Sequence, residues 1–308
     1  MITRHFLTIA DLGEEGLCAL LRGAARMKGN RAYGRRVLAH HTIALVFQKP
    51  SMRTRVAFEV AVLQLGGSVI YLGQGDIQLG QREPIKDVAR VLSRYVDGIV
   101  VRTFAHRDVT EFARYASIPV INGLSDLVHP CQALADLFTL EEHFGRLKRV
   151  HLAYVGDGNN VLHSLVEGCA MLGVNVTVAT PNGYRPDALI WKAATRSAKA
   201  HGASLRWEAD PRSAVRGADV VYTDVWVSMG KEQERRKRVK AFRAYQLNRS
   251  LLKSAAPGCR IMHCLPAHRG EEITDEVMEN PRSLVFEQAE NRLHVQKALL
   301  HMLLGKNA

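Results

Sequence analysis

The sequence has no long apolar run, no cysteine-rich motif and no linker rich in glycine, proline or serine. Its 308 residues include 24 glycines, 10 prolines and only 6% aromatic residues. The longest apolar stretches have the length of a β-strand, well below the roughly 18 residues that a transmembrane helix needs. Residues 1–12 lack the apolar segment and the small-residue cleavage site of a secretory signal. We therefore expect a cytoplasmic protein with no membrane partner.

The cysteines are few and scattered. Five occur, at Cys18, Cys131, Cys169, Cys259 and Cys264. Their number is odd, and they form neither a CxxC pair nor a Cys/His cluster at the spacing of zinc ligands. The sequence therefore predicts neither a disulfide framework nor a structural metal.

Acidic residues are in the minority. Lysine and arginine number 42 against 30 aspartates and glutamates, which gives a net charge of +12 and a surface that attracts anions. The densest charged run, 231–240, mixes two glutamates with six basic side chains and contains no aromatic residue. That pattern favours a solvent-exposed helix face over a nucleic-acid patch. We expect no nucleic-acid partner, and a basic nucleic-acid-binding protein stays as the non-enzyme alternative.

Short strand patterns alternate with helical patterns almost throughout the chain. The strand patterns lie at 42–47, 68–72, 97–101, 118–121, 151–155, 174–180, 204–208, 219–223 and 260–264. Such alternation gives parallel sheets covered by helices. The sequence therefore predicts an α/β fold with two doubly wound parallel-sheet domains and a cleft between them for the active site. We place the domains at residues 1–145 and 146–287, with a C-terminal helix at about 288–304 that packs back on the first domain.

Ligands of open α/β sheets bind beyond the carboxyl ends of the strands. The first strand pattern is followed by Gln-Lys-Pro-Ser-Met-Arg-Thr-Arg at 48–55 and then by a helix that is apolar on nearly every face, which we expect to be buried. Arg53 and Arg55 in its first turn oppose the helix dipole, so an anion should lie there. Together with the hydroxyls of Ser51 and Thr54 they predict a phosphate site. The alternative is that the arginines pair with surface carboxylates.

Other chemically capable residues also follow strand patterns. Arg102 is another cation at a strand end, for which a surface arginine is the alternative. His129 precedes Pro130 at a predicted helix start, where its ring could polarise a carbonyl group, or simply cap the helix or pack in the core. Gln132, in the same helix, offers an amide donor and an acceptor.

Three further segments stand after the strand patterns of the second half. Residues 156–160 contain a Gly-x-Gly, but the third glycine and the ribose-binding acid of a dinucleotide site are missing, so we interpret them as a turn that presents Asn160. Asp224 and Ser228, four residues apart, could hold an amino group. Cys264 places a thiol at a strand tip, where a small buried hydrophobe is the alternative.

Together these motifs resemble the aspartate/ornithine carbamoyltransferase family over essentially the whole chain. The resemblance rests on residues 47–55, 129–132, 263–266 and 290–292, and residues 224–230 with Asn160 and Cys264 are similar to the ornithine branch. It implies transfer of the carbamoyl group of carbamoyl phosphate to the δ-amine of L-ornithine, giving L-citrulline and phosphate, in arginine metabolism. It also implies that 1–145 binds carbamoyl phosphate and 146–287 binds ornithine. A carbamoyltransferase for another amine, such as putrescine, is the alternative enzyme.

The resemblance carries over residue by residue. It implies that carbamoyl phosphate is bound by Ser51, Met52 (through its backbone), Arg53, Thr54, Gln78, Arg102, His129, Gln132, Cys264, Leu265 and Arg292. It implies that ornithine is bound by Asn160, Asp224, Ser228 and Met229, and that the catalytic residues are Arg102, His129, Asp224 and Cys264.

Three further expectations follow from the resemblance. Gln78 matches a position that reaches into a neighbouring subunit's site, which implies a homotrimer or a multiple of trimers. Met52 stands where the commonest family pattern has threonine, so a backbone contact at this position would preserve phosphate binding. No metal and no organic cofactor is implied, because the phosphate leaving group is already activated.

Overall fold

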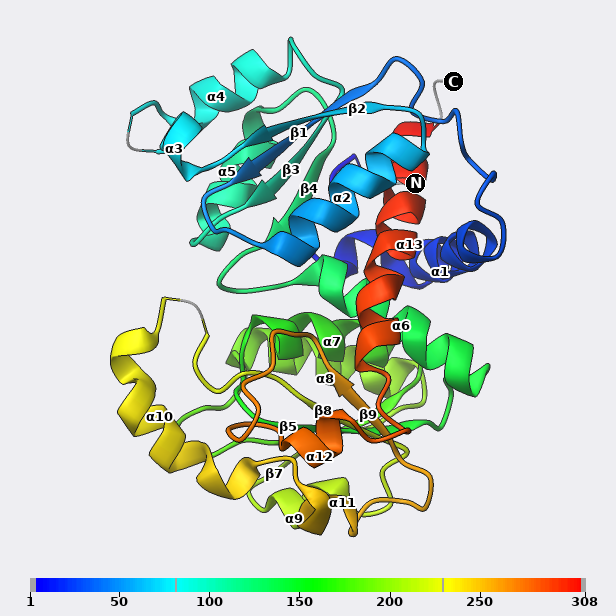
Figure 1. Cartoon of the computed structure of the whole chain (residues 1–308), viewed down its shortest axis with the longest axis vertical. Coiled ribbons are helices and arrows are strands. Elements are labelled where there is room, and N and C mark those ends of the chain that lie inside the picture. The colour runs from blue at the N-terminus through cyan, green and yellow to red at the C-terminus, as the bar shows by residue number, and fades with distance from the viewer. Residues whose placement is uncertain (1–3, 81, 229, 306–308) are drawn as a thin grey trace. The chain divides into compact units, whose positions relative to one another are not determined.

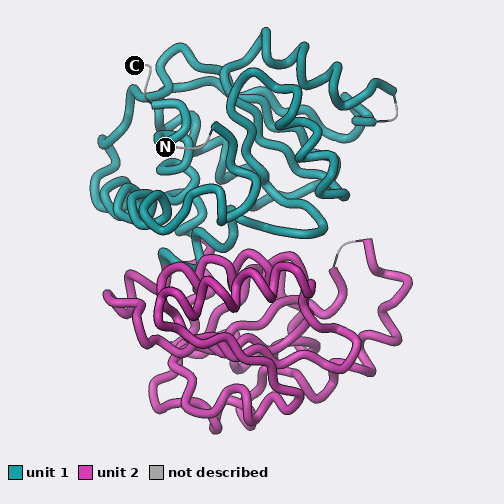
Figure 2. The backbone as a smooth tube through the Cα atoms, turned by 180° about the vertical axis from the view of Figure 1, so that it is seen from behind, with its two compact units in different colours: residues 1–138, 290–308 teal, residues 139–289 magenta. Residues whose placement is uncertain are grey.

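The computed structural model contains two compact α/β units (Figures 1 and 2). It describes residues 4–80, 82–228 and 230–305. Unit 1 comprises Met1–Phe138 and Glu290–Ala308, and unit 2 comprises Thr139–Ala289. The chain therefore passes between the units within two helices, α6 (Pro130–Phe144) and α13 (Val285–Leu304).

Unit 1 is built on a four-stranded parallel sheet with the order β2-β1-β3-β4. Its strands are β1 (Thr42–Phe47), β2 (Ser68–Leu72), β3 (Gly98–Arg102) and β4 (Val120–Leu124). Its described helices, besides its parts of α6 and α13, are η1 (Ile9–Leu12), α1 (Gly13–Gly29), α2 (Met52–Gln64), α3 (Gln74–Ile77), α4 (Ile85–Leu92) and α5 (His106–Tyr115).

Unit 2 is built on a five-stranded parallel sheet with the order β7-β6-β5-β8-β9. Its strands are β5 (His151–Val155), β6 (Asn175–Ala179), β7 (Leu205–Glu208), β8 (Val220–Thr223) and β9 (Arg260–His263). Its described helices, besides its parts of α6 and α13, are α7 (Asn160–Met171), α8 (Ala188–Ala200), α9 (Pro211–Val215), η2 (Glu232–Glu234), α10 (Arg235–Phe242), η3 (Arg243–Tyr245), α11 (Arg249–Leu252) and α12 (Asp275–Met278).

The central strands are continuous apolar runs because both faces of each sheet are covered. In β1 every residue from Ile43 to Phe47 is buried, and in β3 all five residues are buried. Val88 of α4 and Phe112 of α5 belong to the same apolar core as these strands. The predicted fold class of two parallel-sheet α/β domains is confirmed, and each of the nine predicted strand patterns overlaps a strand of the structure.

In each sheet the chain adds its first strands on one side of the starting strand and its later strands on the other side. In unit 1 the chain continues from β1 to β2 on one side, while β3 pairs with β1 on the other. In unit 2 the corresponding neighbours are β5 and β8. Helices leave such a pair of strands toward opposite faces of the sheet, which opens a crevice at the carboxyl ends. The residues that end or follow β1, β3, β5 and β8 are therefore the ones to inspect.

One expectation about the helices is wrong. Helix α2 was expected to be buried all round, but it buries only one side, with Thr54, Phe58, Ala61 and Val62. Val56 is 49% exposed and Leu63 is 61% exposed, because a helix that covers one face of a sheet leaves its opposite side open. The predicted exposed helix at 231–240 is present as η2 and α10. No helix among the described residues is long and apolar enough to cross a membrane.

Candidate active site

The turn between β1 and α2 presents hydrogen-bond donors at a helix N-terminus. Ser51 is the N-cap of α2, and its hydroxyl accepts a hydrogen bond of 3.3 Å from the N–H of Thr54. The two hydroxyl oxygens of Ser51 and Thr54 lie 3.1 Å apart. The N–H groups of the first helical turn, which begins at Met52, have no partner inside the helix. This turn therefore offers a place for an anion.

The hydroxyl of Thr54 is the point where two arginines meet. Arg292 of α13 donates a hydrogen bond of 2.7 Å to it, and Arg102, the last residue of β3, donates a longer one of 3.4 Å. All three side chains are buried, with Thr54 at 0%, Arg102 at 7% and Arg292 at 3% exposure. Since Arg102 is adjacent to β1 in the sheet, the strand order itself brings it to the N-terminus of α2.

The electrostatics of this group favour a negative ligand. Burial, with Arg292 and Arg53 nearby, lowers the pKa of Arg102 to about 9. Arg53 forms no ion pair with a described residue, and within the same part of the chain the buried Nε of Arg102 has no hydrogen-bond partner. A buried charge without a counter-ion destabilises the folded state, and an anion bound here would remove that cost.

A neutral imidazole and an amide lie beside the arginines. His129 stands directly before α6, as predicted, and is 5% exposed. Burial, followed by Arg292 and Arg102, holds the pKa of His129 well below 6.5, so the ring is neutral at physiological pH. Gln132 donates a hydrogen bond of 2.8 Å to Asp136, and its buried Oε1 has no partner among the described residues. These groups can accept or donate hydrogen bonds without adding charge.

Arg55 does not belong to this group. Its guanidinium pairs with Glu59 at 2.8 Å and stacks over the ring of Tyr71, 3.7 Å from the centroid. The alternative interpretation, that the arginines of this turn pair with surface carboxylates, is therefore correct for Arg55. The separate alternative for Arg102, a surface arginine, is wrong, because that side chain is buried.

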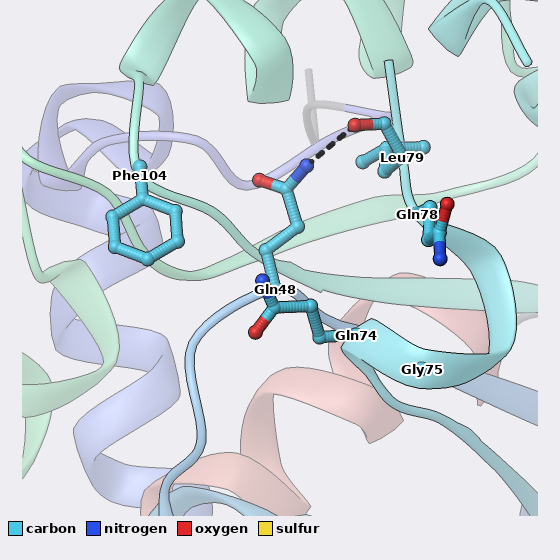
Figure 3. A pocket seen from close by; sticks show the side chains of 6 residues that line it. All are labelled: Gln48, Gln74, Gly75, Gln78, Leu79 and Phe104. Carbon is cyan, nitrogen blue, oxygen red and sulfur yellow. Dashed lines mark hydrogen bonds between the residues drawn. The ribbon is translucent and has the colours of Figure 1, made fainter. Parts of the chain in front are cut away.

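Gln78 also lies outside the hydrogen bonds around Thr54. It follows α3 with a left-handed backbone (φ 37°), and its side chain is exposed. It lines a pocket of about 420 Å³ together with Gln48, Gln74, Gly75, Leu79 and Phe104 (Figure 3). In that pocket the amide of Gln48 donates a hydrogen bond of 2.9 Å to the carbonyl of Leu79.

Unit 2 gathers a carboxylate, a thiol and an amide beyond the ends of β8, the edge strand β9 and β5. Asp224 directly follows β8. Its Oδ2 accepts a hydrogen bond of 2.6 Å from Asn159, and its Oδ1 accepts bonds of 2.9 Å from the Cys264 thiol and 2.8 Å from the N–H of Val225. Asp224 and Cys264 are 4% and 9% exposed. The carboxylate is thus held in one orientation by three donors.

Asn159 was not predicted from the sequence, and it directly precedes Asn160, the predicted ornithine ligand. Asn160 begins α7, whereas Asn159 caps it by accepting hydrogen bonds from Val161 N and Leu162 N at 3.0 and 3.2 Å. An asparagine directly before a helical pattern is the signal that could have found it. The preceding Gly158 is required, because a Cβ there would lie 2.4 Å from backbone atoms of Arg185 and Pro186.

A second ring of polar residues supports this group and was also missed. Arg238 of α10 donates to Asp157 at 2.9 Å and to the carbonyl of Trp226 at 3.0 Å. His263 accepts a hydrogen bond from Leu265 N at 2.9 Å and contacts Glu272 at 3.2 Å through its other nitrogen. Arg238 and Asp157 lie 81 positions apart in the sequence, so no spacing rule could have paired them.

The remaining predicted residues are less constrained. Ser228 is half-buried in the loop after β8, and its carbonyl accepts a hydrogen bond of 3.0 Å from Lys231 N. Leu265 is half-buried and has a positive φ of 57°. Met229 lies outside the described residues.

The donor atoms of Asp224, His263 and Cys264 lie within 4.8 Å of one another, a spacing that a metal could bridge. Both ring nitrogens of His263 take part in hydrogen bonds to other protein groups, and the Cys264 thiol donates to Asp224. Metal ligands need those same atoms. The arrangement therefore fits a hydrogen-bonding role for these side chains.

These features define a two-unit α/β protein of the enzyme class. Unit 1 offers a helix N-terminus with two buried arginines beside it, and unit 2 offers a hydrogen-bonded carboxylate and thiol. The family model "Aspartate/ornithine carbamoyltransferase, carbamoyl-P binding domain" matches residues 4–142, and "Aspartate/ornithine carbamoyltransferase, Asp/Orn binding domain" matches residues 148–303. The chain belongs to the aspartate/ornithine carbamoyltransferase family.

Individual relatives agree over their full length. The ornithine carbamoyltransferase of Thermococcus kodakarensis is 53% identical over 304 residues, covering 98% of this chain and 96% of the relative. That of Archaeoglobus fulgidus is 52% identical over 307 residues, covering 99% of both. The solved structure of ornithine carbamoyltransferase from Pyrococcus furiosus superposes with a TM-score of 0.95 at 51% identity, covering 98% of this chain and 97% of that one.

Proposed function

We propose that this chain transfers the carbamoyl group of carbamoyl phosphate to the δ-amine of L-ornithine, giving L-citrulline and phosphate. The observation that carries the proposal is the meeting of Arg102 and Arg292 at the buried hydroxyl of Thr54, beside the N-terminus of α2. Relatives at 53% and 52% identity, both ornithine carbamoyltransferases, support the choice of reaction.

The phosphate of the donor is assigned to the turn that starts α2. In this proposal the phosphate is bound by the hydroxyls of Ser51 and Thr54, the N–H of Met52 and the guanidinium groups of Arg53 and Arg102, since a helix N-terminus attracts anions. The side chain of Met52 is 69% exposed, which supports a contact through its backbone. Methionine in place of threonine is then compatible with phosphate binding.

The carbamoyl group is assigned to Arg102, His129, Gln132 and Arg292, with the backbone of Cys264 and Leu265. When the amine attacks the carbonyl carbon, its oxygen becomes an oxyanion, and donors already fixed in place stabilise that charge. Because His129 is neutral, it donates or accepts a single hydrogen bond without competing for the phosphate charge. Phosphate leaves with the electron pair of the C–O bond, so neither a metal nor an organic cofactor is needed for this step.

Ornithine is assigned to unit 2. Asp224 and Ser228 would hold its α-amino group, while Asn160 and the backbone of Met229 would hold its carboxylate. The δ-amine has a reference pKa near 10, so it must lose a proton before it attacks. In this proposal Cys264 orients the amine through its sulfur, while its own proton is held by Asp224 at 2.9 Å. The proton lost before attack goes to solvent, and after attack one of the two protons on the newly bonded nitrogen passes to the departing phosphate.

Citrulline formation tests this function directly. The purified chain is incubated with carbamoyl phosphate and either L-ornithine or putrescine, and the carbamoylated product is measured colorimetrically. We expect product with ornithine and little with putrescine, because putrescine lacks the carboxylate that Asn160 and Met229 would bind. Product with putrescine alone would point to the other amine, and no product with either would contradict carbamoyl transfer.

We further propose a homotrimer, or a multiple of trimers, acting in the cytoplasm. Three observations support the assembly. Gln78 is exposed and lies outside the hydrogen bonds around Thr54. Two apolar residues of α2, Val56 and Leu63, are exposed, and so is Ile70 of the edge strand β2, at 47%. None of the five cysteines forms a disulfide, which suits a reducing compartment.

Subunit mixing tests the shared site. Arg102→Ala and Gln78→Ala proteins, each expected to be nearly inactive, are unfolded together and refolded as a mixture. If Gln78 acts in the neighbouring site, mixed trimers contain sites with both native residues and activity returns. Absence of recovery, with light scattering showing that mixed trimers form, would place Gln78 in its own subunit's site or outside it.

A further inference from the structure

The charged run at 231–240, which the proposed reaction does not use, forms one wall of a second pocket. This pocket has a volume of about 880 Å³ and lies entirely within unit 2, along α10 (the yellow helix of Figure 1). We call it the basic pocket. It is lined by Trp226, Arg235, Arg236, Val239, Lys240, Arg243, Gln246, Gly270 and Glu271.

The lining carries a strong excess of positive charge. Four of its side chains are basic and one, Glu271, is acidic. Glu271 is already paired with Arg235. Arg236, Lys240 and Arg243 are exposed and form no ion pair with a described residue. They follow one another at spacings of four and three positions, so they share one side of the helix and repel each other.

The second observation is a buried donor in the same lining. Trp226 is only 2% exposed, and among the described residues its indole N–H has no hydrogen-bond partner. Its ring is held by stacking on Phe242, with centroids 6.0 Å apart. Buried N–H groups are nearly always satisfied, so an acceptor atom of a ligand is expected here.

We propose that the basic pocket binds a compact polyanion of the oligophosphate class. A volume of this size lies within the range of small-molecule sites. Three unpaired cations on one helix side match the several charges of a triphosphate chain better than a single phosphate, and a phosphate oxygen can accept the N–H of Trp226. The site lies in unit 2 alone and does not depend on the proposed reaction.

Calorimetric titration of the full chain with inorganic tripolyphosphate tests the proposal. Saturating inorganic phosphate is present throughout to fill the anion site of unit 1. The test variant is Arg236→Gln/Lys240→Gln/Arg243→Gln. The matched control is Lys192→Gln/Arg196→Gln/Lys199→Gln, which removes three exposed charges at the same spacing from α8.

We expect the unmodified chain and the control to bind tripolyphosphate alike, and the test variant to bind at least about tenfold more weakly. Trp226→Phe keeps an aromatic ring in place of the indole and removes the N–H, so it should weaken binding by about fivefold. This variant also keeps the test decisive if the triple substitution fails to fold. A parallel titration with ATP distinguishes a free phosphate chain from a nucleotide as the source of the same chemistry.

Two results would overturn the proposal. Equal affinity of the test variant and the control would show that α10 does not bind the anion. Loss of tripolyphosphate binding in Arg53→Gln, with binding intact in the test variant, would place the anion at the N-terminus of α2 instead.

Discussion

Arg292 donates a hydrogen bond of 2.7 Å to the hydroxyl of Thr54, although 238 positions separate the two residues. Thr54 belongs to the first turn of α2 and Arg292 to α13, so the candidate anion site of unit 1 is completed by a helix from the far end of the chain. The Thr54 hydroxyl orients two cations at once, since Arg102 donates to it as well.

Thr54→Val is therefore expected to disorder both arginines while keeping the shape of the side chain. Hydrogen bonds to charged groups contribute roughly 1.5 to 3 kcal/mol, so kcat/KM for carbamoyl phosphate should fall by about 10- to 150-fold. Thr54→Ser keeps the hydroxyl and serves as the control, with a much smaller loss. Steady-state kinetics with varied carbamoyl phosphate would show it, and equal effects of the two variants would mean that the hydroxyl does not matter.

Removing the charge of Arg102 should stabilise the ligand-free protein. Burial, Arg292 and Arg53 lower its folded pKa from 12.5 to about 9, so its charge destabilises the fold at every pH below about 9, and the penalty fades as the pH rises toward 12.5. At pH 7.5 we expect Arg102→Gln to raise Tm by about 2–4 °C, the usual shift for about 1 kcal/mol in a chain of this size.

With phosphate bound, the unmodified chain should have a higher Tm than Arg102→Gln. Inorganic phosphate binds only the folded state and should raise the Tm of the unmodified chain, but not that of Arg102→Gln. Arg55→Gln is the matched control, because Arg55 is exposed and paired with Glu59. A phosphate shift that survives in Arg102→Gln, measured by thermal melting, would show that this arginine is not part of the anion site.

His129 makes the stability of the fold depend on pH on the acid side, whereas Arg102 does so on the alkaline side. Its folded pKa lies below the ordinary 6.5 because of burial, Arg292 and Arg102, so the unfolded chain takes up the proton first as the pH falls. The stability that neutral His129 supplies is fully present above pH 6.5 and is lost below it, by up to about 1.4 kcal/mol per pH unit. His129→Gln should therefore lose less stability than the unmodified chain between pH 7.5 and 5.5.

Denaturant unfolding at the two pH values measures this difference, with the exposed His40→Gln as control. The acid limb of the pH–rate profile should also stay unchanged in His129→Gln apart from its height. A displaced acid limb would show that His129 titrates during turnover, contrary to the neutral ring inferred here.

Asn159 combines two roles that substitutions can separate. Asn159→Ser keeps a capping side chain for α7 but cannot hold Asp224, so stability should stay near normal while KM for ornithine rises several-fold or more. Asn159→Ala loses both, with a further cost of about 0.5–2 kcal/mol in unfolding free energy. Matching KM values for the Ser variant and the unmodified chain would show that Asn159 caps the helix and does nothing for Asp224.

Substitutions of Cys264 test whether its sulfur orients the δ-amine. Removing the sulfur in Cys264→Ala should lower kcat by about 100-fold, the loss that follows when a reacting group is misplaced, and turnover measured across the pH range would show it. Cys264→Ser, which can still donate to Asp224, should retain more activity. Turnover and profile identical to the unmodified chain would make the sulfur a bystander.

The fold was largely predictable because its signals are local. Each strand pattern, such as Thr42–Phe47, is a short apolar run of the kind that buried parallel strands require, and the alternation with helices decides the class. The exposed side of α2 was not predictable, since apolar composition does not reveal which helix faces a sheet leaves uncovered.

The candidate site was predictable only in part. The N-terminus of α2, Arg102 and His129 could be located because motifs at strand and helix ends have positional meaning. The part that Asn159 plays was not predicted, because two adjacent asparagines differ only in which one directly precedes the helix. The separate fates of Arg53 and Arg55 depended on Glu59 and Tyr71, whose positions relative to the helix turn decide which arginine is drawn away.

The strand orders of the two sheets carry a further consequence. Most candidate residues lie at or beyond the ends of strands, among them Arg102, Asp224 and Cys264, whereas the strands themselves are part of each buried core. Residues that would bind the substrates and residues that form the sheets thus lie in separate segments of the chain. Natural or engineered variants could exchange residues 225–230 for another loop, and so accept a different amine, while the sheet beneath kept its register.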